Sequence, residues 1–373
     1  MSEKIRDIAR MLIPIVVPLA LAGLVMFLIR LPQQNSPEPA PPERDPMVLY
    51  LSPSGDPELW IAAPDGAAPT QVTDTGGKVL DYAPSPTGTW IALGIRNEQG
   101  GIDLWEMERN GGGWSEPVLI LPCGADFCIN PAYSPDGARI AYTRRVVEVA
   151  SGPPGVPHVW LLDRAEGSTD VWTSDPNVGG YEPSWSPDGR YLGFFDGLGG
   201  GIRVADMQTK ESFLVPSEMG FPGSWSPDGN SLLYVEFDQA GSQPSVPVYQ
   251  LNVETRDSTP VLRPGGHQSG VEFSVPDWSP DGKWVVVAQR LLSGSPSKQL
   301  FIARLDGSEW QAVTDAPVFT HAVPRWDPLG RGVVYQRLEL GSSDSLPQIA
   351  YWDRTSGQVT VLSEDGFQPR WIR

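Results

Sequence analysis

Hydrophobic residues in this chain come in short runs of three or four, and a turn signal separates almost every run from the next. Short apolar runs bounded by Gly, Pro, Asp and Ser predict β-strands rather than helices. Between the runs recurs the pentapeptide Trp-Ser-Pro-Asp-Gly, intact at 185–189, 225–229 and 278–282. Altered copies stand at 84–88, 133–137 and 326–330. Repetition at intervals of roughly 40–50 residues predicts a repeat architecture.

The pentapeptide predicts a tight hairpin. Ser, Pro, Asp and Gly suit the four positions of a type I turn, in which Pro presets φ and Gly takes the left-handed conformation. Each copy should therefore join two antiparallel strands, such as the strand expected at 139–142 and the one before it. A third strand follows, as at 159–161, and then a fourth, as at 171–172. Four short strands in each repeat are typical of a β-propeller blade.

The two ends of the chain supply one further blade. Third strands are recognisable seven times, but the hairpin motif occurs only six times. Residues 369–371 repeat the Pro-x-Trp start of a motif, and 47–50 reads as a second strand with no hairpin before it. A blade built from both ends closes the ring and removes exposed sheet edges. We therefore predict an all-β, seven-bladed β-propeller over residues 47–373, closed by the N- and C-terminal strands.

The N-terminal region predicts a membrane anchor. Residues 11–30 follow the basic tail 1–10, and their 19 uncharged positions up to Ile29 span about 28 Å as a helix. Basic residues before this transmembrane helix place the tail in the cytoplasm and the propeller outside. A cleaved signal peptide with a small-x-small site at 20–22 is the alternative. Residues 31–46 are rich in proline and predict an extended linker. The expected location is thus the cell membrane, single-pass, with an extracytoplasmic propeller.

Charge narrows the range of partners. The net charge of the chain is −18, and residues 1–31 contribute four basic and two acidic side chains, which leaves about −20 for the rest. So acidic a surface argues against nucleic acid as a partner. It serves solubility, and it would also suit a cationic protein or peptide. Cys123 and Cys128 lie in one loop, where a disulfide is expected outside the cell. No nearby histidine completes a zinc site, so we predict neither a metal nor a cofactor.

The segments that precede each Pro-x-Trp lead into the innermost strands, which line one mouth of a propeller's central channel. A mixed polar and aromatic rim of this kind suits a ligand or peptide. A solvent-filled mouth with packing aromatics is the alternative. The candidate rim residues are Asp81, Asn130, Tyr181, Glu182, Phe221, His321, Phe367 and Gln368.

The motif Pro-x-Trp-Ser-Pro-Asp-Gly at 183–189 and 276–282 resembles the repeats of TolB-like propellers, which are built from WD40-like (PD40) repeats. The Asp-Gly turns at 65–66 and 306–307 add to the resemblance, which covers about residues 47–373. It implies the fold. Propellers of this kind serve as binding platforms, as accessory domains of serine peptidases and as lyases. TolB has an α/β domain before its propeller, whereas here only the proline-rich linker stands before the first strand. No Gly-x-Ser-x-Gly nucleophile elbow is present.

Two functions remain open from the sequence. The first is a non-enzymatic, membrane-anchored platform that binds a protein or peptide. The alternative is a small-ligand or carbohydrate-active, lyase-like propeller, with Asp81, Glu182 and His321 in acid–base roles at the channel rim. Catalysis requires a convergent cluster of acid, histidine and arginine side chains, whereas a platform requires only a broad exposed rim.

Overall fold

The computed structural model describes residues 44–147, 155–238, 245–262, 271–291 and 296–373, all within one compact unit. Their regular structure consists of β-strands. None of the described residues forms an apolar helix with the length needed to cross a bilayer. The predicted tail at 1–10, the anchor at 11–30 and nearly all of the linker at 31–46 lie outside the described residues.

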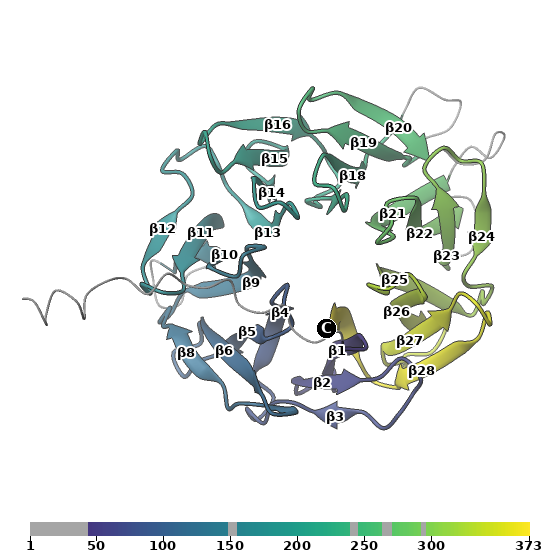
Figure 1. Cartoon of the computed structure of the whole chain (residues 1–373), viewed down its shortest axis with the longest axis horizontal. Helices are drawn as coiled ribbons and strands as arrows, with labels where there is room; N and C mark the ends of the chain where they lie inside the picture. Colours follow the sequence, from purple (N-terminus) through teal and green to yellow (C-terminus); the bar gives the residue numbers. More distant parts are fainter. Residues whose placement is uncertain (1–43, 148–154, 239–244, 263–270, 292–295) are drawn as a thin grey trace, which may run out of the picture. The chain divides into compact units, whose positions relative to one another are not determined.

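The strands form a ring of sheets in which each sheet runs outward from the ring axis (Figure 1). The innermost strands are β4 (Val79–Pro84), β9 (Phe127–Tyr133), β13 (Tyr181–Trp185), β17 (Ser224–Trp225), β21 (Val271–Trp278), β25 (Phe319–Trp326) and β29 (Phe367–Ile372). Next to them lie β1 (Met47–Ser52), β5 (Trp90–Arg96), β10 (Arg139–Arg145), β14 (Tyr191–Asp196), β18 (Ser231–Val235), β22 (Trp284–Leu291) and β26 (Gly332–Glu339).

The outer half of each sheet is built in the same way. The third strands are β2 (Glu58–Ala62), β6 (Ile102–Asn110), β11 (His158–Asp163), β15 (Gly201–Asp206), β19 (Val248–Asn252), β23 (Gln299–Arg304) and β27 (Gln348–Asp353). The outermost are β3 (Thr70–Gln71), β8 (Val118–Leu121), β12 (Thr169–Val171), β16 (Ser212–Pro216), β20 (Ser258–Leu262), β24 (Trp310–Ala312) and β28 (Val359–Ser363). A short strand, β7 (Gly113–Trp114), pairs with β6.

The predicted all-β propeller is confirmed, but the prediction of seven separate blades is wrong. The described strands form five separate four-stranded sheets and one nine-stranded sheet. The nine-stranded sheet arises because β6 pairs in parallel with β9 through Ile102 and Phe127. This single bridge joins the strands from β4 to β8 with those from β9 to β12. It depends on a contact between two units in space, which the repeat pattern does not encode.

The first and last strands meet, as the sequence predicted. β29 pairs antiparallel with β1 and forms the inner edge of the sheet β29-β1-β2-β3. The Tyr82 hydroxyl on β4 reaches the carbonyl oxygen of Leu49 at 2.9 Å and also that of Gln368. The two ends of the described unit are thus held to each other and to the neighbouring sheet.

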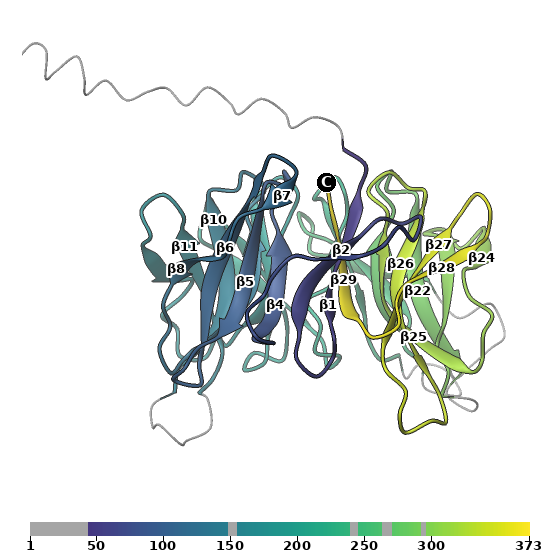
Figure 2. The ribbon, with the colours of Figure 1, turned by 90° about the horizontal axis from the view of Figure 1, so that it is seen from below.

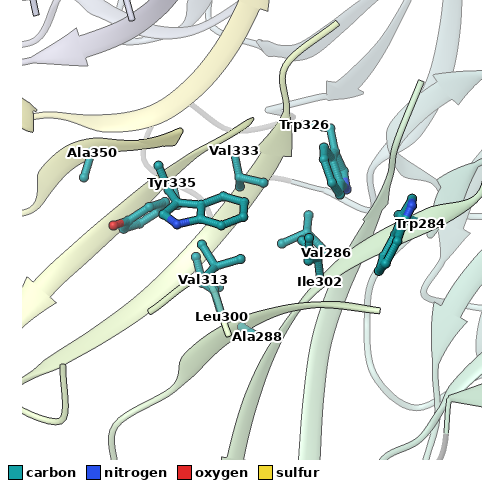
Figure 3. Packing of buried hydrophobic residues seen from close by; sticks show 11 residues of the cluster. Trp284, Val286, Ala288, Leu300, Ile302, Val313, Trp326, Val333, Tyr335 and Ala350 are labelled. Atoms are coloured by element: carbon teal, nitrogen blue, oxygen red, sulfur yellow. The ribbon is translucent and has the colours of Figure 1, made fainter. Parts of the chain in front are cut away.

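Apolar side chains fill the spaces between neighbouring sheets. In one such cluster, Val286 and Ile302 pack against Val333 and Tyr335 of the next sheet (Figure 3). All four side chains are at most 1% exposed. Because every sheet buries both faces, its second strand is apolar almost throughout, and this explains the uninterrupted runs in the sequence.

The recurring pentapeptide forms the expected turn. In the copy at 185–189, the Gly189 N–H donates to the Ser186 carbonyl at 2.9 Å, and φ of Gly189 is +73°. The Ser186 hydroxyl donates to Asp188 Oδ1 at 2.5 Å, and the same oxygen accepts the Arg190 N–H. Asp188 therefore stabilises its own turn through these hydrogen bonds, as predicted.

The motif tryptophan joins neighbouring sheets. The Trp185 indole N–H donates to the Ala132 carbonyl at 3.1 Å, and Trp278 bonds in the same way to Ser224. Trp225 and Trp371 repeat the contact with Ser184 and Arg325. Each indole thus adds a directional bond to the apolar packing between two sheets.

Cys123 and Cys128 form the predicted disulfide. It closes the connection between β8 and β9, and the carboxylate of Asp103 fixes the same connection by accepting the Cys123 N–H at 2.7 Å. The disulfide therefore lies next to the bridge that joins the two halves of the nine-stranded sheet.

Replacing both cysteines with alanine should lower the free energy of unfolding by about 2 kcal/mol, because the unfolded chain regains the entropy of a short closed loop. Denaturant unfolding of the two proteins, with and without a thiol reductant, measures the difference. Reductant should destabilise only the wild type. Equal stability of the two oxidised proteins would contradict the expected role of the disulfide.

The ring has two distinct faces. The turn face carries the Ser-Pro-Asp-Gly turns, and the loop face carries the connections from second to third strands and from one sheet to the next (Figure 2). Asp45, near the start of the described unit, pairs with Arg331 directly after the turn at Gly330, at 3.3 Å. The chain therefore enters the ring on the turn face.

Candidate functional site

The predicted rim position coincides with a β-bulge in the innermost strands. The pairing between first and second strands shifts register there, for example between Tyr181 and Ser184 in β13. Left-handed φ values of 49–55° occur in the bulge at Asn130, Glu182, Val323 and Gln368. This conformation is unfavourable for a non-glycine residue by about 1–3 kcal/mol. Backbone strain of this kind is concentrated at functional sites.

Asp81, at the same position in β4, is almost completely buried and tied to its neighbours. Its carboxylate accepts the backbone N–H of Asn130 at 2.7 Å and the side-chain amide of Asn130 at 3.1 Å. On its other side, the Arg370 guanidinium of β29 approaches to 3.8 Å. One carboxylate thus links three innermost strands.

A second ion pair joins two other innermost strands, β21 and β25. Arg325 of β25 approaches Asp277 of β21 at 3.5 Å, and Asp277 also accepts the Trp326 N–H at 2.9 Å. The Ser224 hydroxyl of β17 also donates a hydrogen bond to this carboxylate, at 3.5 Å. Asp277, Arg325 and Arg370 all occupy the middle position of Pro-x-Trp.

Glu182 connects the two ion pairs electrostatically. The charges of Asp81, Arg370 and Arg325, which come from β4, β29 and β25, all act on the pKa of its carboxylate. Those strands are not the ring neighbours of β13, which lie on either side as β9 and β17 (Figure 1). We call Asp81, Glu182, Asp277, Arg325 and Arg370 the axial cluster. Among the described residues, Glu182 is its one member whose charged group has no hydrogen bond or ion pair.

Burial governs the protonation of the cluster. Loss of water raises the pKa of Asp81 and of Asp277, and the neighbouring guanidinium groups oppose the shift. Desolvation also raises the pKa of Glu182, and the negative charge of Asp81 adds to the effect. The charged form of Glu182 is therefore destabilised in the folded protein, although the residue remains exposed.

Replacing Glu182 with glutamine should raise the melting temperature at pH 7 by up to about 2 °C. Because the folded-state pKa of Glu182 lies above its unfolded value, the wild type becomes more stable as pH falls through that window. The advantage of Glu182→Gln should therefore disappear near about pH 4, measured as melting temperature against pH. Asp136→Asn provides the opposite control, since its turn lowers the pKa of Asp136 and the substitution should destabilise at pH 7. A destabilised Glu182→Gln variant at pH 7 would contradict this interpretation.

The structure brings some of the predicted rim residues to the axial cluster and leaves others apart. Asp81, Asn130 and Glu182 belong to the cluster or contact it. Tyr181 packs at a tilt against Phe195, and its hydroxyl donates to the Gly220 carbonyl. Phe221, the residue after Gly220, is 41% exposed on the loop face. Phe367 packs into the apolar core beside β1, and Gln368 bonds through its backbone to Gln336 and Tyr82.

His321 does not reach the cluster. The residue is 1% exposed and packs edge-on against Tyr335, and its Nδ1 lies 2.7 Å from the Lys298 carbonyl oxygen. Desolvation lowers the pKa of His321. A buried neutral imidazole with one nitrogen occupied is suited to a structural role and not to the proton transfer that the sequence suggested.

Sequence reasoning missed Asp277, Arg325 and Arg370. A signal for them exists, because each stands two residues beyond a rim position and side chains alternate along a strand. The described residues contain no group of three or more His, Cys, Asp or Glu side chains arranged to hold a metal ion. Within the described part of the chain, the axial cluster presents one unpaired carboxylate, that of Glu182, together with two guanidinium groups that pair with Asp277 and Asp81.

Comparison with known proteins supports the fold. No family model and no curated protein matches the chain. An oligogalacturonate lyase from Vibrio parahaemolyticus has a similar structure at a TM-score of 0.61 and 13% identity, over 84% of this chain and 92% of the lyase. TolB from Acinetobacter baumannii is similar at a TM-score of 0.50 and 16% identity, and the match covers 91% of this chain and 88% of TolB.

A puromycin-hydrolyzing peptidase from Mycobacterium tuberculosis gives a TM-score of 0.63 at 16% identity, but the match spans 86% of this chain and only 52% of the peptidase. Together with the ring of sheets, these similarities show that the chain has a β-propeller fold. Since similar folds include a lyase and a peptidase as well as TolB, function must be argued from the site.

Proposed function

We propose that this propeller is a non-enzymatic binding platform that engages a protein or peptide through its loop face and its axial cluster. The observation that carries the proposal is that seven of the 13 exposed large hydrophobic residues among the described residues lie on that face. They are Val146, Val156, Leu198, Phe221, Phe237, Val318 and Leu346. A face with several exposed apolar side chains offers contacts to a protein partner.

The axial cluster adds charge to this surface. Asp81 and Asp277 have guanidinium partners, whereas Glu182 has none among the described residues. A lysine, arginine or N-terminal amine of a partner would pair with Glu182 and relieve the cost of its partial desolvation. The acidic balance of the whole chain would favour encounter with such a cationic partner.

We further propose the location that the sequence suggested. A membrane anchor at 11–30 would hold the propeller outside the cell, and the linker would join it on the turn face, where Asp45 lies.

Affinity purification of the detergent-solubilised full chain from its own membranes tests the binding function. We expect a partner to co-purify with the wild type and to be lost when Phe221 and Leu198, both on the loop face, are replaced together by aspartate. Replacement of Leu329, which is 55% exposed on the turn face, should leave the partner bound. Absence of any partner under several growth conditions, or equal recovery with all three proteins, would contradict the proposal.

A lyase-like enzyme is the second candidate, and the convergence of acids and arginines in the axial cluster favours it. The similar structures include an oligogalacturonate lyase, so oligogalacturonate is the substrate to try. In this reading Glu182 would exchange the proton and Arg325 and Arg370 would hold carboxylates. Turnover of oligogalacturonate by the wild type, lost in Glu182→Gln, would establish it. The absence of turnover is the outcome that the binding proposal predicts.

A further inference from the structure

The outer strand β8 differs from the other outer strands. Its residues Val-Leu-Ile-Leu include no polar side chain, whereas every other outermost strand among the described residues contains Ser, Thr, Gln or Asp. Val118 is 62% exposed and Leu119 is 42% exposed. Among the described strands, β8 pairs only with β6, so the N–H and C=O groups along its other edge are available to a further strand. Proteins normally protect such edges with charge.

A pocket lies inward of this edge, between Pro117, the residue before β8, and the loop-face ends of β4 and β5. Its volume is about 320 Å³, and Trp105 and Pro117 contribute to its apolar wall. Trp105 stands opposite Leu119 in the ladder between β6 and β8, so both side chains lie on the same face of the sheet. A strand added beside β8 would point every second side chain to that face.

The charge of the pocket sets it apart from the rest of this acidic protein. Lys78 and Arg96 line it, and within the described part of the chain neither side chain has an ion pair or hydrogen bond. Glu98 also lines the pocket and is likewise unpaired, which leaves a local excess of one positive charge. The backbones hold the two cations together, because the Arg96 N–H donates to the Lys78 carbonyl at 3.0 Å.

We infer that the free edge of β8 binds an extended peptide segment, which adds as a strand and turns its acidic side chains toward the pocket that Lys78 and Arg96 line. Backbone hydrogen bonds to the edge would supply affinity, and the pocket would supply selectivity for the carboxylate. This surface is distinct from the axial cluster, and it favours a partner of the opposite charge.

Fluorescence anisotropy of the full chain in detergent tests the inference. The probes are a labelled hexapeptide that alternates valine and glutamate and a matched one that alternates valine and glutamine. We expect the acidic probe to bind with a Kd of about 100 μM and the neutral probe at least about fivefold more weakly. General repulsion by a chain of net charge −18 would give the opposite order.

Two variants and two controls locate the site. Lys78→Gln combined with Arg96→Gln should remove the preference for the acidic probe, and Val118→Lys should weaken both probes at least about tenfold by protecting the edge. Val359→Lys makes the same change on outer strand β28, where Val359 is 43% exposed, and Lys283→Gln removes an exposed cation on the turn face. Neither control should alter binding. No binding of either probe up to about 1 mM, or binding that survives Val118→Lys, would overturn the inference.

Discussion

Deleting residues 367–373 should leave a chain that no longer unfolds in a single cooperative transition and that aggregates. The deletion removes β29, which pairs with β1 from Met47 to Leu51 and forms the innermost strand of its sheet. It exposes the edge of β1, whose residues Val48 to Leu51 are at most 1% exposed in the closed ring. Tyr82 also loses the Gln368 carbonyl, and Arg370 no longer faces Asp81.

Thermal unfolding followed by circular dichroism, together with size-exclusion chromatography, measures this effect. Deletion of Arg373 alone is the matched control, because it removes exposed contacts to Pro328 and Arg109 and leaves β29 intact. A synthetic peptide of residues 364–373, added in trans, should restore part of the cooperative transition. An unchanged melting curve for the longer deletion would show that the ring does not depend on closure by β29.

Replacing Glu182 with lysine should weaken binding of the partner by about 100-fold, or roughly 3 kcal/mol. The axial cluster has three carboxylates and two guanidinium groups, and the substitution changes this to two carboxylates and three cations. A cationic group of the partner would then meet repulsion where it now meets the unpaired Glu182. Because residue 182 is exposed, the substitution should change the melting temperature by no more than about 2 °C, the limit expected for Glu182→Gln.

Surface plasmon resonance with the purified partner measures the loss of affinity. Glu166→Lys is the matched control, since it gives the same change in net charge at an exposed turn away from the axis. The affinity of Glu166→Lys should fall only slightly, and more salt should remove the remaining difference. If both variants lose affinity equally, the partner responds to the overall charge and not to the axial cluster.

Much of the fold could be predicted because each repeat carries its own local signals. The turn at 185–189 needs only Pro, Asp and Gly at fixed positions, and the apolar run 191–194 follows from burial of both faces of a sheet. The bridge between Ile102 and Phe127 could not be predicted, since it depends on how two units approach each other. It replaced two of the expected separate sheets with one.

The site was harder to predict than the fold, because the repeat pattern does not reveal which side chains point toward the ring axis. Asp81 and Glu182 were found because they stand at one position of the repeat. The strained backbone of Glu182 gave no signal, because a left-handed glutamate has no distinctive sequence. The burial of His321 under Tyr335 depends on packing between β25 and β26, and no periodicity reveals it. Arg325 and Arg370 could have been found by reading the next inward-facing position around the ring.

The most direct test of the central claim, that the loop face binds the partner, is site-specific photo-cross-linking in the native membrane. A photo-reactive phenylalanine analogue is placed at Phe221 or Leu198 on the loop face and, as a control, at Leu329 on the turn face; all three positions are at least 41% exposed. We predict that both loop-face positions cross-link to the same partner and that position 329 does not. Cross-linking at position 329 alone, or equally at all three positions, would contradict the account.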